Sequence, residues 1–508
     1  MVGPVRPDRR RRLSDDFAGP AVRGSAVMAS RIALSILEHL RTRPGAPVLH
    51  FGTGTISAGD LADRIDRLSR GLRSLDRHGR IGIAMETAPD TLALFIASLI
   101  AARETFVLDP SWPEATIAQV TASTGLDAVV AQMDAAPAGA IGAETLARMG
   151  ADAQVPFSMD EDAAEPLFTL FTSGSTGMPK GCRRTETSWL RSFEADRALA
   201  DLEGRGLVLV PGNLAHSLFL YAAVRGLWAG CAIALFPRFR PDRVLALADR
   251  FGDCAMFAVP TQLSALCAAA ERRHPGVKRV LLTGSKLPSA VAGQARHTFP
   301  GAALIEFYGT TELSYVAARH VDANDPPTLV GKPLAGVDVM VVDDAGAPCP
   351  PGARGRVFVR SGMAFDGYVR NGRFEPAEAS IGVGDAGWLD EEGNLHLDGR
   401  IDRMFQSSGR NIVPETIEAA LAAVEGIEAA AVFGIPDPVR EHRIVAVLKA
   451  PVASGRSAIV GGLKKSLPPY AIPGHYFECG DWPLTVSGKP DLVTLRERLD
   501  GGTLEPLA

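Results

Sequence analysis

The sequence predicts a layered α/β protein with parallel strands, followed by a smaller domain of mixed helices and strands. Between residues 31 and 110, amphipathic helical segments alternate with short apolar runs, and this alternation is typical of strand–helix–strand units. Several later apolar runs end in glycine-containing turns, as at 280–288. From 341 to 399, short alternating runs separated by glycine and proline predict a small β subdomain. We therefore expect a large domain of layered α/β subdomains that carries this β subdomain and precedes an α+β domain.

Length and composition exclude several classes of protein. The 508 residues suit about two to four domains, and 46% hydrophobic with 22% charged residues is typical of a soluble globular chain. A net charge of −5 gives no basic field for nucleic acid or an acidic membrane. The six cysteines show no C-x-x-C pair, and the apolar run at 91–102 is too short to cross a bilayer. We expect a cytoplasmic protein that binds neither nucleic acid nor membrane.

The first part of the chain contains clear local signals. Residues 1–30 are rich in arginine, glycine and proline and predict a disordered extension. Apolar spacing of three and four predicts helices, and short apolar or β-branched runs predict strands. The expected elements are a helix at 32–42, a hairpin at 48–56, a helix at 57–75, a strand at 81–85, a helix at 91–102 and a strand at 106–108.

A loop after the run from Pro166 to Phe171 has the composition of a phosphate site. Its glycines can turn successive backbone N–H groups toward one point, while hydroxyl groups add donors and a lysine adds a mobile charge. It is not a Walker A loop, because neither serine nor threonine follows the lysine. The pattern predicts polyphosphate binding by Thr172, Ser173, Gly174, Ser175, Thr176, Gly177 and Lys180.

Further strand-like runs end in polar turns at 211–217, 260–261, 283–288 and 308–312. Because the carboxyl ends of parallel strands meet at one edge of a sheet, we expect these turns to share a site with the phosphate loop. In the last turn, Tyr308 offers a flat aromatic face, Thr311 a hydroxyl and Glu312 a hard carboxylate oxygen. The same residues also fit a helix N-terminus with glutamate in its first turn. In the β subdomain, Asp385 offers two carboxylate oxygens that can each accept a hydrogen bond.

These segments resemble the signature motifs of the adenylate-forming superfamily, which includes acyl- and aryl-CoA synthetases, peptide-synthetase adenylation domains and luciferases. The likeness runs in order through the phosphate loop, 308–312, 384–390, 399–403 and 483–491, so chance is an unattractive explanation. It implies that a carboxylate attacks Mg-ATP to give an acyl-adenylate and pyrophosphate, and that a thiol then takes the acyl group. The chain is most similar to stand-alone AMP-forming acyl- or aryl-CoA ligases.

The resemblance also implies roles for individual residues. Tyr308 would face adenine, Thr311 the α-phosphate, Glu312 Mg²⁺ and Asp385 the two ribose hydroxyls. Lys489 would be the catalytic lysine of adenylation together with Thr311 and Glu312, and Arg400 would reach ribose or phosphate. Asp402 would be the hinge to a mobile C-terminal domain, which sets domains at 31–400 and 403–508 with the hinge at 401–402. Gly409 would approach a pantetheine tunnel. Gly284 and Ser285 would border the nucleotide, and the implied acid pocket comprises His216, Ser217, Val259, Thr261 and Gly309.

Three readings of function remain open at this stage. The segment 214–220 offers no acidic partner for an amino-acid ammonium, so a neutral acyl or aryl acid is favoured, with CoA as the acceptor. A ligase that loads a separate phosphopantetheinyl acyl carrier protein is the alternative. Arg183, Arg184, Arg238 and Arg240 are candidates to contact CoA phosphates or an acidic carrier. A non-catalytic nucleotide-binding homologue is disfavoured, because Lys489 and Glu312 are both present.

Overall fold

The computed structural model describes residues 30–75, 79–132, 139–153, 165, 167–172, 179–204, 206–438, 440–449, 455–485 and 488–507. The predicted N-terminal extension lies outside the described residues except for Ser30. Ser30 is buried, caps the first helix by accepting from the Ala33 N–H and donates to the Glu186 carboxylate. Ser30 thus ties the start of the described chain to α6 (Glu186–Ala195) through Glu186.

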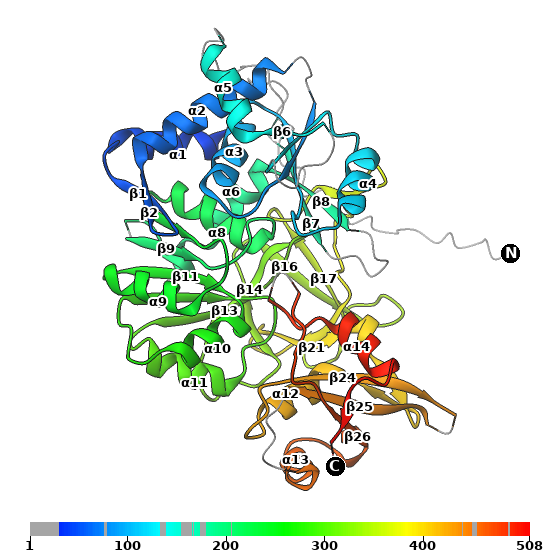
Figure 1. Ribbon diagram of the computed structural model, residues 1–508. Coiled ribbons are helices and arrows are strands. Elements are labelled where there is room, and N and C mark those ends of the chain that lie inside the picture. Colours follow the sequence, from blue (N-terminus) through cyan, green and yellow to red (C-terminus); the bar gives the residue numbers. More distant parts are fainter. Residues whose placement is uncertain are drawn as a thin grey trace, which may run out of the picture.

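A 13-stranded sheet forms the centre of the molecule (Figure 1). Neighbouring strands from β1 to β13 run parallel, with β2 and β14 antiparallel to their neighbours. The predicted β subdomain continues this sheet through β15. In sheet order the strands are β16 (Val337–Val342), β17 (Gly355–Ser361), β20 (Asp385–Leu389), β21 (Leu395–Arg400), β15 (Leu329–Pro333), β14 (Ser314–His320), β13 (Ala303–Thr310), β12 (Val277–Leu282), β11 (Cys254–Ala258), β9 (Leu207–Val210), β10 (Ala232–Leu235), β1 (Pro47–Phe51) and β2 (Gly54–Ser57).

An eight-stranded sheet forms a second layer. Its strands from β7 to β6 are parallel, and β8, β18 and β19 extend it with antiparallel pairing. In sheet order they are β19 (Arg373–Pro376), β18 (Gly367–Arg370), β8 (Lys180–Thr185), β7 (Leu167–Thr172), β4 (Glu104–Val107), β3 (Arg80–Ala84), β5 (Ala128–Ala131) and β6 (Ile141–Gly142).

The largest core lies between the two sheets and explains why the strands are apolar on both faces. Val208 and Val210 of β9 face this core, whereas Leu207 and Leu209 face a second core on the opposite side. Two-sided burial of this kind is expected of parallel strands covered by helices. The first core receives α1 (Arg31–Thr42), α2 (Ala58–Ser74), α3 (Pro89–Ile100), α5 (Ala143–Asp152), α6 (Glu186–Ala195), α7 (Arg197–Ala200) and α8 (Ser217–Trp228). The second receives α9 (Pro241–Arg250), α10 (Pro260–Ala269) and α11 (Ser289–Thr298), while α4 (Glu114–Thr124) packs on the eight-stranded sheet.

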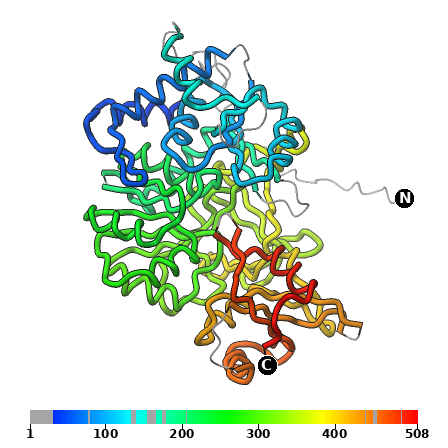
Figure 2. The backbone as a smooth tube through the Cα atoms, in the orientation of Figure 1, coloured from blue at the N-terminus to red at the C-terminus, as the bar shows by residue number. Residues whose placement is uncertain are grey.

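The C-terminal part of the chain forms a smaller α+β unit, orange and red in Figure 2. Its side chains form cores of their own. Helices and strands are mixed in this unit, as the sequence predicts for an α+β domain. They are η2 (Ile401–Arg403), β22 (Phe405–Ser407), β23 (Arg410–Ile412), α12 (Pro414–Ala422), β24 (Ala429–Asp437), β25 (Glu441–Lys449), α13 (Arg456–Leu463), η3 (Pro469–Ala471), β26 (His475–Glu478), α14 (Leu492–Asp500) and β27 (Glu505–Pro506).

One expected element is wrong. No helix starts at Thr311 and Glu312; these residues form the turn that joins β13 to the antiparallel strand β14. The segment after the turn, 314–320, satisfies its backbone groups by pairing with β13, and tertiary pairing of this kind overrides a local capping preference.

Among the described helices, none is both long enough and apolar enough to cross a membrane.

Candidate active site

The turns at the carboxyl ends of β9, β11, β12 and β13 meet at one edge of the central sheet, as the sequence predicts. These four strands are parallel neighbours, so residues 211–217, 259–261 and 283–285, which follow strand ends, lie on the same side as 308–311, where β13 ends. Ser217 Oγ lies 3.0 Å from Thr311 Oγ1, which ties the start of α8 to the end of β13. Two hydroxyl groups are thus held side by side at this edge.

A loop of the C-terminal unit docks at the same edge and places Lys489 there. Thr261 Oγ1 donates to the carbonyl of Gly488 over 2.5 Å. Gly284 has a φ of +93°, and a Cβ added to it would lie 3.0 Å from Cε of Lys489 and 3.2 Å from a methyl carbon of Val259. Glycine is therefore required at 284 both for its backbone angle and to leave room for the lysine.

The charges around Lys489 leave it poorly neutralised. Burial, and then the nearby charge of Arg400, lower the pKa of Lys489 below its ordinary value, while Asp385 and Glu312 act in the opposite direction. Two cations and two carboxylates therefore share a small volume. An ammonium with a lowered pKa in such a place is suited to meet a polyanion that brings the missing negative charge.

Asp385 sits at the start of β20 with its carboxylate already oriented. The Tyr308 hydroxyl donates to Asp385 Oδ2, and Nε of Arg400 lies 3.7 Å from Oδ1. Burial raises the pKa of Asp385, and the hydroxyl of Tyr308 and the charge of Arg400 oppose that rise. Burial, and then the charge of Asp385, raise the pKa of Tyr308, so its phenol stays protonated and serves as the donor.

Glu312 receives a hydrogen bond that the sequence does not reveal. The Tyr368 hydroxyl, on β18, donates to Glu312 Oε1 over 2.9 Å. Burial, and then the charge of Glu312, raise the pKa of Tyr368, so the hydroxyl remains a donor. The two residues are far apart in the chain and no motif includes Tyr368, so only the pairing of β18 with β8 could have indicated this contact.

The phosphate loop spans the gap between two paired strands. Thr172 ends β7, Lys180 begins β8, and the two residues are direct partners in the antiparallel register. Ser173, Gly174, Ser175, Thr176 and Gly177 lie outside the described residues. Burial, and then the charge of Glu312, raise the pKa of the Cys182 thiol, which places the base of this hairpin close to Glu312.

Arg184 is a correction to the sequence analysis. Its side chain is 1% exposed, so the hypothesis that it contacts CoA or a carrier at the surface is wrong. Its guanidinium donates to the carbonyl of Thr311 over 2.5 Å, to Ser314 Oγ over 2.8 Å and to the carbonyl of Met363. Burial lowers the pKa of Arg184 to about 10, so it is still a cation at neutral pH. It fixes the turn that carries Thr311 and Glu312.

The other three arginines proposed to contact CoA or a carrier lie in different surroundings. Arg183 pairs with Asp366, and its guanidinium lies 3.3 Å from the ring centroid of Phe374. Arg240 pairs with Asp242 over 3.0 Å at the surface, and Arg238 is exposed.

The remaining predicted residues occupy mixed positions. His216 is the N-cap of α8, and Ser285 is an exposed residue of the turn after β12. Gly309 is close-packed, since an added Cβ would lie 2.0 Å from the carbonyl oxygen of Ser314. Asp402 lies in η2, where its carboxylate is 3.4 Å from the Arg400 guanidinium.

The hairpin that carries Gly409 makes its main contacts away from this edge of the central sheet. Gly409 has a φ of +70° in the turn of β22–β23, and the described contacts of β22 are chiefly with β25 and β24. In this arrangement Lys489 faces the strand ends, while the Gly409 hairpin rests on the C-terminal sheet.

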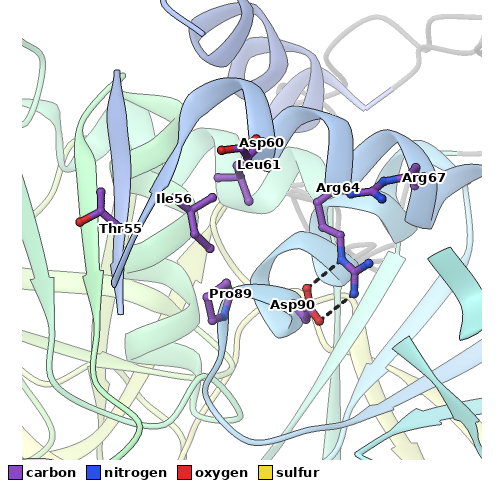
Figure 3. Close-up of a pocket in the computed structure, with 8 residues that line it drawn as sticks. All are labelled: Thr55, Ile56, Asp60, Leu61, Arg64, Arg67, Pro89 and Asp90. Carbon is purple, nitrogen blue, oxygen red and sulfur yellow. Dashed lines mark hydrogen bonds and ion pairs between the residues drawn. The ribbon is translucent and has the colours of Figure 1, made fainter. Parts of the chain in front are cut away.

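A surface cavity of about 320 Å³ elsewhere on the protein involves none of the predicted residues. Figure 3 shows that it lies between β2, α2 and the start of α3, with Arg64 pointing toward Asp90. The Arg64 guanidinium donates twice to Asp90, over 2.9 and 2.8 Å, and pairs with Glu144 over 2.8 Å. Its charge is therefore neutralised within the protein, and this cavity does not compete with the strand-end site.

Comparison with known proteins agrees with this geometry. The family described as AMP-binding enzyme matches residues 36–369, and the AMP-binding enzyme C-terminal domain matches residues 416–489. An uncharacterized acyl-CoA ligase, YhfT of Bacillus subtilis, is 31% identical over 88% of this chain and 94% of its own length. The putative long chain fatty acid-CoA ligase VraA of Staphylococcus aureus is 26% identical over 89% of this chain and 96% of its own.

Solved structures show the same fold at low identity. ATP-bound MatB from Rhodopseudomonas palustris superposes with a TM-score of 0.80 at 22% identity, covering 91% of this chain and 98% of MatB. MenE, the O-succinylbenzoate coenzyme A synthetase of Bacillus subtilis in complex with AMP, gives a TM-score of 0.76 at 21% identity, covering 90% and 96%. The large N-terminal and small C-terminal units predicted from sequence are thereby confirmed as the architecture. With its family match over most of the chain, this protein belongs to the AMP-binding enzymes, the adenylate-forming superfamily that its motifs resemble.

Proposed function

We propose that the protein is an AMP-forming ligase that joins a neutral acyl or aryl carboxylic acid to CoA. In the first step a carboxylate oxygen bonds to the α-phosphorus of ATP, the bond to the bridging oxygen breaks, and pyrophosphate leaves. In the second step the thiol sulfur bonds to the acyl carbon, the thiol proton is lost, and AMP leaves. The single observation that carries this proposal is the docking of Lys489 at the strand ends beside Asp385 and Glu312.

The nucleoside half of ATP has a suitable place at Asp385. Vicinal ribose hydroxyls can donate to the two carboxylate oxygens, which Tyr308 and Arg400 already hold in position. The ring of Tyr308 offers a face to the base. We assign Gly284 and Ser285 to the border of the same nucleotide site, because they follow β12 directly beside Lys489.

Positioning and charge supply the catalysis in this proposal. Negative charge grows around phosphorus as the carboxylate attacks, and a preorganised cation in a desolvated site stabilises it without reorganisation. Lys489 is that cation, and the Thr311 hydroxyl is a donor fixed by Ser217. The loop from Thr172 to Lys180 would hold the departing pyrophosphate.

The donor set fits Mg²⁺ that arrives with ATP rather than a resident metal ion. Among the described residues, no group of three or more His, Cys, Asp or Glu side chains could enclose an ion. Mg²⁺ typically binds one or two carboxylates together with substrate phosphates, and Glu312, oriented by Tyr368, provides such a carboxylate. Bound there, the ion would neutralise phosphate charge during adenylation.

The thiol step requires Lys489 to withdraw, so we propose that Asp402 is the hinge between domains 31–400 and 403–508. Rotation at residues 401–402 would remove the lysine loop and bring another face of the C-terminal domain to the strand ends. In this scheme Gly409 lines the thiol path after the rotation. The names of YhfT and VraA support CoA rather than a carrier protein as the acceptor.

His216, Ser217, Val259 and Gly309 remain our assignment for the acid pocket. Thr261 lies in the same turn as Val259, but its hydroxyl donates to the Gly488 carbonyl in this arrangement. We therefore assign Thr261 first to docking the loop that carries Lys489. No acidic side chain occurs at 214–220, which favours an acid without an ammonium group.

Acid-dependent pyrophosphate release with Mg-ATP tests this function across a panel of short, long, branched and aromatic acids, each with and without CoA. We expect one class of acid to support turnover, CoA to accelerate it, and acyl-CoA and AMP to form in equal amounts. Turnover that ignores CoA would contradict the choice of acceptor. No release with any acid would overturn the ligase.

A further inference from the structure

A glutamate at the start of α12 contacts the strand on the other side of the proposed hinge. Helix α12 belongs to the C-terminal domain and packs against β21 of the N-terminal domain (Figure 1). The backbone N–H of Arg400, the last residue of β21, donates to Glu415 Oε1 over 3.3 Å. A Cβ added to Gly399 would lie 2.4 Å from Glu415 Oε2. The carboxylate of Glu415 therefore rests directly on the backbone of β21.

The same carboxylate is also tied into its own domain. Nη1 of Arg403 donates to Glu415 Oε1 over 2.9 Å, and its Nη2 donates to Glu418 Oε1 over 2.5 Å. Glu418 lies one turn further along α12 and accepts from the N–H of Val432 over 2.8 Å. Arg403, Glu418 and Val432 all follow the hinge. The hydrogen bonds described for Glu418 thus stay within the C-terminal domain, whereas those of Glu415 cross the hinge.

The contact of Glu415 with β21 belongs to the arrangement that docks Lys489. At the strand ends, Thr261 donates to the carbonyl of Gly488, beside Lys489. The C-terminal domain is therefore held at two separate points, one next to the hinge and one next to the lysine. Because β21 precedes the hinge and α12 follows it, rotation at 401–402 carries Glu415 away from Arg400 as it withdraws Lys489.

The carboxylate of Glu415 is held incompletely. The described structure gives its buried oxygen Oε2 no hydrogen-bond partner. Burial raises the pKa of Glu415, and the charge of Arg403 opposes that rise. An unpaired buried acceptor is costly, and rotation that returns Oε2 to water would recover this cost. The contact therefore favours one arrangement without locking it, as an enzyme that alternates between two arrangements requires.

We propose that Glu415 is a positioning residue for adenylation, which holds α12 against β21 and thereby favours the arrangement with Lys489 at the strand ends. The proposal rests on the ligase function and adds a residue that sets the balance between its two half-reactions. Without this contact, a smaller fraction of molecules is ready for adenylation, while the thiol step, which needs the lysine withdrawn, is not impaired. A purely structural role would instead slow both steps.

The test measures both half-reactions in Glu415→Ala: acid-dependent pyrophosphate release, and transfer from synthetic acyl-adenylate to CoA. We expect pyrophosphate release to fall about three- to tenfold, and transfer to be at least as fast as in the unmodified enzyme. Glu418→Ala is the matched control, because it removes the other carboxylate partner of Arg403 from the same helix. Its ratio of the two rates should stay unchanged, even if lower stability reduces both rates.

Glu415→Gln separates the contact across the hinge from the charge. Its amide oxygen can still accept from the Arg400 N–H, so its rate of pyrophosphate release should lie between those of Glu415→Ala and the unmodified enzyme. A variant as slow as Glu415→Ala would assign the effect to the charge beside Arg403 and overturn the inference. An unchanged ratio of rates in Glu415→Ala, or an equal shift in Glu418→Ala, would overturn it as well.

Hydrogen exchange of the unliganded protein distinguishes failure of this inference from failure of the ligase function, because it needs no turnover. The backbone N–H of Arg400 donates to Glu415, and that of Ile401 donates to the carbonyl of Gly384 over 2.9 Å. Faster exchange of these two amides in Glu415→Ala than in Glu418→Ala supports the contact across the hinge even if no acid is turned over. Equal exchange in Glu415→Ala and the unmodified protein contradicts it.

Discussion

The hydrogen bond from Tyr368 to Glu312 gives a prediction that the family motifs alone do not. Tyr368→Phe removes one hydroxyl at 2.9 Å from Glu312 Oε1 and keeps the ring that packs on Phe365. A hydrogen bond to a charged group contributes about 1.5–3 kcal/mol when buried. Because Glu312 is half-buried, we expect the loss of this hydrogen bond to cost about 1–2 kcal/mol. This free energy corresponds to a change of about five- to thirtyfold in a binding or rate constant.

The loss should appear as weaker activation by magnesium. Carboxylates that bind metals depend on their own hydrogen-bond partners for orientation, so Tyr368→Phe should raise the magnesium concentration for half-maximal pyrophosphate release about tenfold. Saturating magnesium should restore most of the rate. Tyr476→Phe is the matched control, because the described structure gives the buried Tyr476 hydroxyl no hydrogen-bond partner. Unchanged magnesium dependence in Tyr368→Phe would refute the assignment of Glu312 as the ion's carboxylate.

Three further predictions concern the turn after β13 and the lysine. Arg184→Met should lower the free energy of unfolding by about 1–3 kcal/mol, as measured by urea denaturation, because it leaves the Thr311 carbonyl without its buried donor; a change below about 0.5 kcal/mol would contradict this role. Gly309→Ala should be destabilised or inactive by thermal melting and pyrophosphate assay, since its Cβ would lie 2.0 Å from the Ser314 carbonyl oxygen; a fully active, equally stable variant would contradict the close packing. Burial lowers the pKa of Lys489, so the adenylation rate, which needs the ammonium, should fall as pH rises through that lowered pKa. Lys489→Arg should move this alkaline limb to higher pH, and an unmoved limb would assign it to another group.

Local patterns were sufficient for most of the fold because the strands are buried on both faces. The apolar run at 207–210 becomes β9, whose residues divide between two cores, and the amphipathic segment 57–75 becomes α2. The turn at Thr311 and Glu312 could not be predicted in this way. Its conformation follows from the pairing of β13 with β14 and from Arg184, both of which are tertiary contacts.

The candidate site could be predicted only as far as sequence motifs extend. The motifs placed Tyr308, Asp385, Arg400 and Lys489 in one site, and the structure brings these four side chains together. Tyr368 was missed because it comes from a strand of the other sheet.

The account's central claim is that Lys489 at the strand ends serves adenylation and leaves before the thiol step. The most direct measurement separates the two half-reactions of Lys489→Ala: acid-dependent pyrophosphate release, and transfer from synthetic acyl-adenylate to CoA. The account predicts that adenylate formation is abolished while transfer to CoA stays close to that of the unmodified enzyme. An equal loss in both half-reactions would contradict it.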